Sequence, residues 1–344
     1  MRTGSPAPLR SRLSVQIACA SVHRGSALLA VLWLAAGLSA IAFSVATTVR
    51  GETERTSTAT DATRAYYLAA GSIDRAILWR AWGMSAAPNP DGTPRYYQPP
   101  MPYLNFDYPS GKVLVEVIPE GGKLNINIAA PHDIEMLLTA MAQDASSAQQ
   151  LAAAIDQWRT PSGPPDVLPL SPAPPSTFPA RHASFQELEE ILLVPGMTPE
   201  LFYGRYNRDS SGRLIPQGGL RDSLTVYGSG ASVDVNTAPP ALLLSLGISA
   251  DAVNQIIARR PFKSMDEVRP LVEGVPGAAR LEIGGSAIWT LRATARLKLA
   301  NGKLGDLRRS VAAIVKYFDK PGAEQPYQIL RWYDDAWSPT GSSF

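Results

Sequence analysis

The sequence predicts an α+β fold in which a long N-terminal helix packs on an antiparallel sheet, and a large duplicated all-α insertion interrupts that sheet. Three observations predict it. Residues 26–82 contain no proline and keep a helical period, residues 289–299 alternate between apolar and polar side chains, and one pattern in the middle occurs twice. Strands at both ends with helices between them indicate one sheet whose halves are separated in sequence.

Composition limits the chemistry that the chain can support. The 344 residues carry a formal net charge of +2, which names no partner, and leave room for a membrane segment and about two domains. A single cysteine, Cys19, excludes an internal disulfide and a thiolate metal cluster. The three histidines, His23, His132 and His182, stand apart in sequence, which argues against a histidine metal site.

The segment Ser26–Val49 contains no charged residue. About 24 helical residues span about 36 Å, enough to cross a hydrocarbon core of about 30 Å. The preceding residues are basic and lack acids, with Arg2, Arg10, Arg12 and Arg24, whereas mixed charges follow. The positive-inside rule then places the start of the chain in the cytoplasm and the body outside. A secretory signal peptide is the alternative, although its apolar core is usually only about 7–15 residues long.

The helical pattern continues beyond the apolar segment. Apolar side chains recur at i, i+4, i+7 and i+11, namely Tyr66, Ala70, Ile73 and Ile77. We therefore expect one helix of about 57 residues, about 85 Å long, with its first half in lipid and its second half on a folded domain.

Three patterns describe the rest of this domain. Residues 86–110 are rich in Pro, Asn, Gly and Tyr and predict an irregular loop. Lys112–Ile118 and Lys123–Ile128, separated by Glu120-Gly121-Gly122, predict a hairpin. At the end of the chain, residues 289–299 predict a strand with one buried face, a turn follows at Asn301-Gly302, and two more strands follow at Arg309–Phe318 and Tyr327–Tyr333.

The insertion contains an internal repeat. Leu124–Pro131 matches Val233–Pro240, and a leucine-rich helix follows each. The second helix of each copy ends in arginine, at Ala148–Arg159 in the first copy and at Ala250–Arg260 in the second. The third helix of each copy begins with a capping box, Ser184-x-x-Glu187 in the first and Ser264-x-x-Glu267 in the second. Residues 161–179 carry eight prolines and predict a surface loop or spacer of unassigned role.

The N-terminus resembles that of a type IV prepilin. The basic leader ends in Arg24-Gly25 and is followed directly by the apolar helix from Ser26. The resemblance implies that prepilin peptidase cuts after Gly25 and methylates the new amine of Ser26. Most pilins carry Glu at the fifth mature position, where this chain has Ala30. Either the subunit occupies an end of the filament, where no neighbour needs that carboxylate, or the glutamate is dispensable here.

Further motifs narrow the resemblance. Four further features follow the apolar segment: Arg64–Ala69, the Asn-Ile-Asn and Val-Asn-Thr-Ala-Pro pair, Leu193–Thr198 and the closing strands. Their order along the chain resembles that of the type II secretion minor pseudopilin of the K type, the GspK family. The resemblance implies a Gram-negative inner-membrane protein with a periplasmic body. It also implies a place with the I and J minor pseudopilins at the pseudopilus tip, above the major pseudopilin, and a role in initiating or capping assembly for export of folded proteins.

The resemblance also divides the chain. It implies a prepilin leader at 1–25, a transmembrane half-helix at 26–49, a pilin-like α/β domain at 50–128 and 284–344, and a helical insertion at 129–283 with SAM-like or helix-hairpin-helix-like repeats. We expect subunit contacts through the membrane helix and the exposed face of Arg55–Trp82.

No cofactor is required by these patterns, although the resemblance raises the question of calcium. Asn207-x-Asp209-x-Ser211-Gly212 is similar to the start of a calcium loop, but its twelfth position is Gly218 instead of Glu. A plain turn is the alternative for Asn207, Asp209 and Ser211.

Other functional classes fit the sequence less well. A minor pilin of a type IV pilus or competence system would share the export chemistry but predicts a smaller body without the duplicated insertion. Nucleic-acid binding through helix-hairpin-helix turns is disfavoured, because Ser249 replaces the second glycine and acidic residues offset the nearby bases. The sequence lacks nucleophile-elbow, zinc-protease and phosphate-loop motifs, so we expect no enzyme.

Overall fold

A computed structural model describes residues 26–83, 86–98, 101–141, 143–161, 180–228, 232–318 and 326–336. The predicted leader and positions 162–179 of the proline-rich segment lie outside these ranges. By its internal contacts the chain divides into two units, Met1–Thr60 and Asp61–Phe344.

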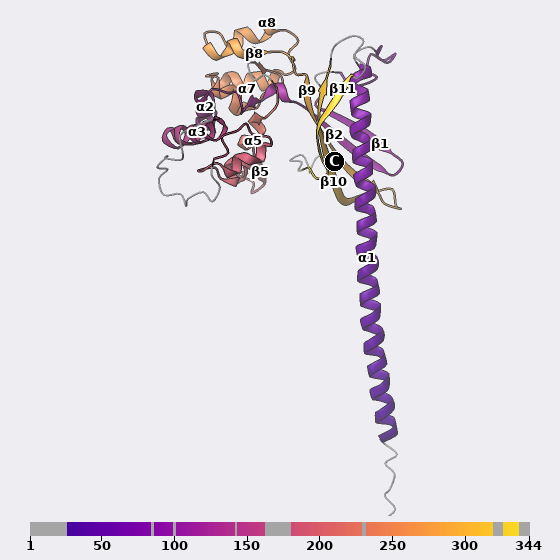
Figure 1. Ribbon diagram of the computed structural model, residues 1–344. Coiled ribbons are helices and arrows are strands. Elements are labelled where there is room, and N and C mark those ends of the chain that lie inside the picture. The colour runs from indigo at the N-terminus through magenta and orange to yellow at the C-terminus, as the bar shows by residue number, and fades with distance from the viewer. Residues whose placement is uncertain are drawn as a thin grey trace, which may run out of the picture. The chain divides into compact units, whose positions relative to one another are not determined.

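The predicted long helix is confirmed as α1, Ser26–Gly83, a continuous helix of 58 residues (Figure 1). In the first unit the side chains from Ala27 to Arg50 are all exposed. The last residue of the helix is glycine for a steric reason, because a Cβ at Gly83 would lie 1.8 Å from the carbonyl oxygen of Tyr97. Only glycine allows the chain to return so close to the helix end.

Five antiparallel strands form the sheet of the second unit, in the order β1-β2-β9-β10-β11. Their bounds are β1 Tyr103–Tyr108, β2 Gly111–Pro119, β9 Ile288–Lys298, β10 Leu304–Tyr317 and β11 Tyr327–Tyr333. Strands β2 and β9 are neighbours, yet the whole insertion lies between them in sequence. The predicted sheet with separated halves is therefore confirmed.

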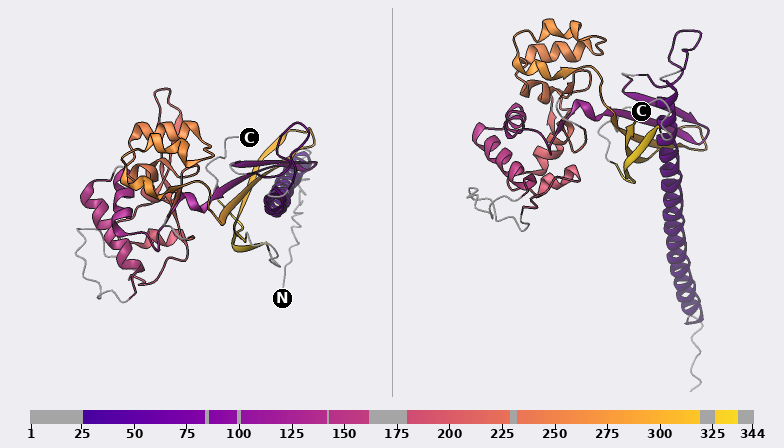
Figure 2. Two further views of the ribbon diagram at one scale, coloured as in Figure 1. Left: turned by 90° about the horizontal axis from the view of Figure 1, so that it is seen from above. Right: turned by 45° about the horizontal axis from the view of Figure 1, so that its top comes forward.

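The second half of α1 lies along this sheet (Figure 2). Its contacts with the sheet are made largely by small side chains. Ala65, Ala69 and Ala76 are buried with Ile73 and Ile77 against β2, β9 and β10. The predicted stripe is correct at the two isoleucines, but at its start it runs one residue too late. Tyr66 and Ala70 are only half-buried, whereas Ala65 and Ala69, one position earlier, are fully buried.

Strand β9 shows the predicted alternation, but its second face is not simply exposed. Thr294 on that face is only 4% exposed. Arg292 donates from Nε to Glu116 at 2.6 Å, and both side chains are largely buried. A cross-strand ion pair thus stands where the alternation predicted contact with water.

Two predictions near the first half of the sheet are wrong. Residues 86–110 are not all irregular, because β1 lies among them. The predicted hairpin of Lys112–Ile118 with Lys123–Ile128 does not form, because β1 and β9 already occupy both edges of β2. Glu120–Gly122 forms a 3-10 turn, η1, instead of a hairpin turn.

The insertion has a core of its own, separate from that between α1 and the sheet. Its first copy contains β3 Leu124–Asn125, α2 Pro131–Ala140, α3 Ala145–Arg159, η2 Leu188–Leu193, α4 Pro199–Tyr203, β4 Arg205–Arg208, β5 Leu214–Gln217, α5 Leu220–Ser223 and β6 Leu224–Thr225. The second contains β7 Val233–Asp234, α6 Pro240–Ser245, α7 Ala250–Arg259, α8 Met265–Val268, η3 Arg269–Leu271, η4 Pro276–Arg280 and β8 Leu281–Glu282.

Each copy is closed by a short parallel ladder between its first and last strands. β3 pairs with β6, and β7 pairs with β8. Leu124 and Ile126 belong to the core of the insertion. These two residues therefore pack with the insertion, although they precede the predicted division between residues 128 and 129, which stays a prediction.

The helix starts within the repeat are set by caps. Ser264 and Glu267 form the predicted capping box of α8. In the first copy, however, η2 begins after Glu187, whose backbone N–H donates to Glu190 at 3.2 Å. Ser184 does not cap this helix, because the cap position is occupied by Glu187, three residues later. The helix α3 starts three residues before the predicted position, at the Asp144 cap.

Candidate functional site

The first candidate site is the membrane half of α1. The helix Ala27–Gly83 contains a window of mean hydropathy 2.3, long and apolar enough to cross a membrane by length and composition. Ala30 lies within its exposed part. Ser26 is the first residue of the helix, whereas Gly25 lies outside the described residues, so cleavage between them stays a prediction.

The second candidate is the exposed face of α1 within the body. Tyr67, Leu78 and Trp82 keep 69%, 40% and 47% of their surface exposed. Gly71 and Asp74 lie between them at helical spacing, so these residues follow one side of the helix, away from the stripe on the sheet. The helix therefore has one face packed in its own domain and one exposed face, and contact of this exposed face with other subunits stays a prediction.

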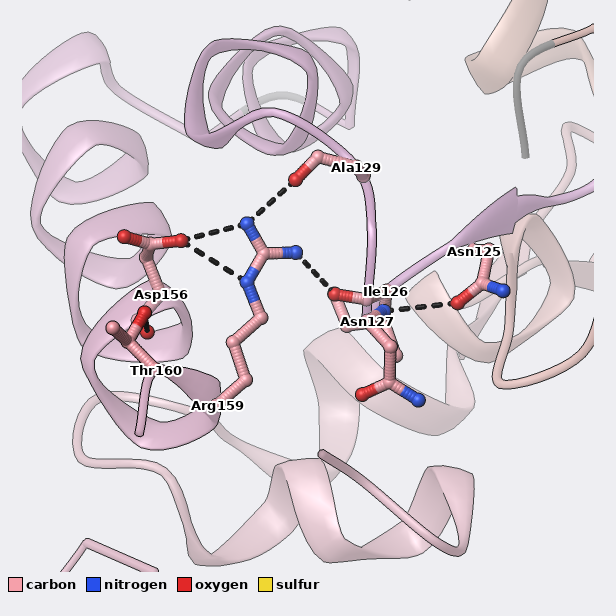
Figure 3. A network of polar contacts seen from close by, with 7 residues as sticks. All are labelled: Asn125, Ile126, Asn127, Ala129, Asp156, Arg159 and Thr160. Carbon is pink, nitrogen blue, oxygen red and sulfur yellow. Dashed lines mark hydrogen bonds and ion pairs between the residues drawn. The ribbon is translucent and has the colours of Figure 1, made fainter. Parts of the chain in front are cut away.

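The repeat in the insertion rests on an arginine and an asparagine in each copy, and Figure 3 shows the first pair. Arg159, at the end of α3, donates to the carbonyl oxygens of Ile126 and Ala129, the latter at 2.5 Å. Asn127 binds the backbone of Phe185 twice: it accepts from N–H at 2.7 Å and donates to the carbonyl at 3.0 Å. These contacts hold the turn between β3 and α2 against two later segments.

The second copy repeats this arrangement with matching residues. Arg260, just after α7, donates to the carbonyl oxygens of Val235 and Ala238 at 2.8 and 2.6 Å. Asn236 accepts from the N–H of Phe262 at 2.8 Å and donates to its carbonyl at 3.0 Å. Burial lowers the pKa of the Arg260 guanidinium from its ordinary value.

The two arginine–asparagine pairs show that the sequence repeat is a structural duplication. The motif pair and the arginines at the helix ends were visible in the sequence. Their roles were not predicted, because they depend on contacts with carbonyl oxygens that only the fold brings near. The sequence signal for these roles is that the asparagine and the arginine occupy matching positions in the two copies.

Two of the candidate calcium residues, Asp209 and Ser211, bind each other, whereas Asn207 binds a residue of β5. Asn207 lies on β4 and donates its amide to Gln217 on β5 at 3.0 Å. Asp209 lies in the following turn, where its Oδ1 accepts from Ser211 N–H, Ser211 Oγ and Arg213 N–H at 2.9, 2.6 and 2.9 Å. The hydrogen bond from Ser211 lowers the pKa of Asp209. The geometry fits a turn; calcium binding here stays untested.

No group of three or more His, Cys, Asp or Glu side chains that could hold a metal occurs among the described residues. The glycine turns of the insertion serve packing. A Cβ on Gly277 would lie 2.1 Å from the carbonyl oxygen of Leu246, so the Val-Pro-Gly turn lies directly on the Leu-Gly-Ile-Ser turn. Ser249 caps α7 by accepting from Ala252 N–H at 3.3 Å. These turns therefore face each other at close range.

Comparison with known proteins places this fold. No family model matches the chain, and no curated protein matches it. Among solved structures, the chain is similar to a chain of the GspK–GspI–GspJ complex from the type 2 secretion system of enterotoxigenic Escherichia coli. The identity is 14% and the TM-score 0.54, and the match covers 83% of this chain and 100% of that chain. The chain therefore has a pilin-like α+β fold of the GspK kind, which supports the resemblance that its motifs indicated.

Proposed function

We propose that the chain is a minor pseudopilin of the K type in a type II secretion system, and that it initiates or caps the pseudopilus. The observation that carries the proposal is the duplicated helical insertion between two adjacent strands of a pilin-like sheet. A minor pilin of a type IV pilus would share the helix and the sheet but predicts a body without this insertion.

The tip position rests on bulk and on Ala30. A filament built from head-to-tail contacts needs every internal subunit to accept another above it. The insertion forms a second core beside the sheet and would obstruct such stacking. A terminal subunit also has no neighbour above that needs a carboxylate to pair with its N-terminal amine, so Ala is acceptable at residue 30.

The proposal assigns the rest of the chain accordingly. Prepilin peptidase cleaves after Gly25 and methylates Ser26, and Ser26–Val49 stays in the inner membrane with the body in the periplasm. Partners are the I and J minor pseudopilins and the major pseudopilin, which the helix meets through the face of Tyr67, Leu78 and Trp82. The role is structural, without catalysis, cofactor or nucleic acid.

Co-purification tests the proposal. The full chain is co-expressed with the I and J minor pseudopilins of the same genome and extracted in detergent through a tag on the I subunit. We expect all three subunits in equal amounts in one peak of a sizing column. Recovery of the I and J subunits together without this chain would refute the assignment.

Calcium binding by the soluble region is a separate proposal that comes from the resemblance. Calorimetric titration of the full chain with calcium, before and after chelation, measures it. If the turn at Asp209 contributes, Asp209→Ala removes the heat signal. An unchanged signal would assign the ion to other residues.

A further inference from the structure

The hairpin of β4 and β5 is exposed to an unusual degree. Its strands pair with each other in a two-stranded sheet, and all four β4 residues are exposed. Tyr206, Leu214 and Ile215 keep 59%, 54% and 49% of their surface exposed. An isolated two-stranded hairpin is marginally stable in water. By the register of the two strands, Tyr206 and Leu214 share one face and Ile215 lies on the other, so both faces expose apolar surface.

The base of this hairpin is fixed to the insertion. Gly204 has φ +86, and a Cβ on it would lie 2.2 Å from the carbonyl oxygen of Gln217. A Cβ on Gly219 would lie 2.2 Å from the carbonyl oxygen of Phe202. The side chain of Phe202 is fully buried. The strands therefore leave the insertion through a backbone crossing without room for side chains. This holds the hairpin ready for a partner and lowers the ordering cost of binding.

The two edges of the hairpin differ. Residues of antiparallel strands alternate between hydrogen-bonded and non-hydrogen-bonded pairs. The N–H of Asp209 donates to the carbonyl of Arg213 at 2.9 Å, so these two residues form a hydrogen-bonded pair next to the turn. The pairs Arg208–Leu214 and Tyr206–Pro216 are then non-hydrogen-bonded pairs. By that alternation the backbone groups of Tyr206 and Arg208 point away from β5. On the opposite edge Pro216, the partner of Tyr206, has no N–H to offer. The outer edge of β4 is therefore the open one.

The charge of the hairpin is positive. It carries Arg205, Arg208 and Arg213 against one acid, Asp209. That acid is occupied within the turn by donors from Ser211 and from the Arg213 backbone. A partner strand lying along β4 would meet arginines on both of its faces, because Arg205 and Arg208 alternate along the strand.

We propose that the outer edge of β4 binds an extended acidic segment of another protein, which adds as a third strand. Backbone hydrogen bonds at Tyr206 and Arg208 give the register, acidic side chains of the segment lie beside Arg205 and Arg208, and an apolar side chain packs on Tyr206. This interaction is additional to the contacts of α1 with other subunits and does not depend on them.

Two other occupants are disfavoured by the same geometry. A hairpin that enters a membrane surface needs apolar residues at its tip, whereas this tip is Asp209-Ser210-Ser211-Gly212. A second copy of the chain paired through β4 would bring together two strands that each carry Arg205 and Arg208, and the repulsion between their positive charges disfavours this pairing.

Peptide binding to the full chain in detergent micelles tests the proposal. The probes are two fluorescent eight-residue peptides, Glu-Glu-Val-Val repeated twice and Lys-Lys-Val-Val repeated twice, which place charged and apolar side chains on both faces of an added strand. Binding is measured by fluorescence anisotropy. We expect the Glu–Val peptide to bind at least about tenfold more tightly, a difference of about 1.4 kcal/mol. Tyr206→Pro removes the outward N–H and should weaken this binding at least about tenfold.

Leu214→Pro is the matched control, because it makes the same change on the opposite edge and should leave the affinity unchanged. Arg208→Glu should reduce binding of the Glu–Val peptide without changing the strand edge. Far-UV circular dichroism and the thermal midpoint establish that each variant is folded.

Three results would overturn the proposal. The first is equal affinity of the two peptides, or an equal loss in the two proline variants. The second is co-sedimentation with phosphatidylglycerol vesicles that Tyr206→Pro abolishes, without peptide binding, which would assign the hairpin to a lipid surface. The third is a concentration-dependent dimer, seen by light scattering, that Arg208→Glu abolishes.

Discussion

At the scale of single residues, the insertion depends on two half-buried arginines, Arg159 and Arg260, that bind backbone carbonyl groups. Arg159 and Arg260 stand at matching helix ends, and each donates to two carbonyl oxygens of the turn that begins its copy. A planar guanidinium can reach both oxygens at once, which an ammonium group cannot do in the same geometry.

We therefore expect Arg159→Ala to lower the free energy of unfolding by about 2–4 kcal/mol, because it leaves two buried carbonyl groups without a charged donor. Arg159→Lys should recover only part of this loss. Arg269→Ala is the control: this exposed arginine pairs with Asp266 on the surface, and its loss should cost less than about 1 kcal/mol. Urea unfolding of the full chain in detergent measures all three. Equal losses for Arg159→Ala and Arg269→Ala would refute the structural role of Arg159.

Alkaline pH should lower the free energy of unfolding through the buried phenol of Tyr97. Burial raises the pKa of Tyr97 to about 12, whereas an unfolded tyrosine ionises near about 10. Below pH 10 both states keep the proton, so the contribution of Tyr97 is complete. Between about pH 10 and 12 only the unfolded state releases it, and stability falls.

In Tyr97→Phe, the loss of unfolding free energy between about pH 9 and 11.5 should be smaller than in the unchanged chain by about 1–2 kcal/mol. Tyr67→Phe removes an exposed hydroxyl and serves as the control. If Tyr97→Phe loses stability with the same slope as the unchanged chain, the buried phenol does not titrate as the structure indicates.

At the scale of elements, α1 presents two faces with different tasks. Ile73 is fully buried on the sheet, and Leu78, little more than one turn later, is 40% exposed on the outer face. Ile73→Ala should lower the free energy of unfolding by about 2–4 kcal/mol, because it leaves a cavity in a closed core. Leu78→Ala should change it by less than about 1 kcal/mol but weaken the complex with the other minor pseudopilins.

Unfolding in urea and co-purification separate these effects. This division of the helix would be contradicted if Ile73→Ala lost the complex while keeping its free energy of unfolding. It would also be contradicted if Leu78→Ala kept the complex intact.

Elements also show where sequence reasoning succeeded and where it failed. Strand β11 was predicted to the residue at Tyr327–Tyr333, and α1 to within one residue, because their signals are local. Strand β3 was joined to the wrong partner, since its ladder with β6 connects residues about 100 positions apart, and no local pattern specifies such pairing. The stripe of α1 was displaced because alanines make the contact, and alanine is a weak signal of a buried face.

At the scale of the whole molecule, the repeat and the separated sheet halves could be predicted because each leaves a pattern in the sequence. The arginine–asparagine pairs and the open edge of β4 could not, because both depend on backbone groups that become neighbours only in the folded chain. The leader and the cleavage point rest on sequence alone, since Gly25 lies outside the described residues.

Processing can be tested at that point. Gly25→Leu should block cleavage, because a peptidase site that accepts glycine has no room for a large side chain. Immunoblots of cells that contain the peptidase should then show the larger precursor. Gly37→Leu is the control, because this position lies in the membrane half with open space around it. A mature band of normal size from Gly25→Leu would exclude cleavage at this site.

We infer that the chain enters a pseudopilus as a processed subunit anchored by its N-terminal helix. The N-terminus of the protein records this processing, so the test is the intact mass, with N-terminal sequencing, of the protein extracted from membranes of processing-competent cells. We expect a mature chain that begins at N-methylated Ser26. A chain that keeps the leader in the same cells would leave an ordinary single-pass anchor and contradict the pseudopilin assignment.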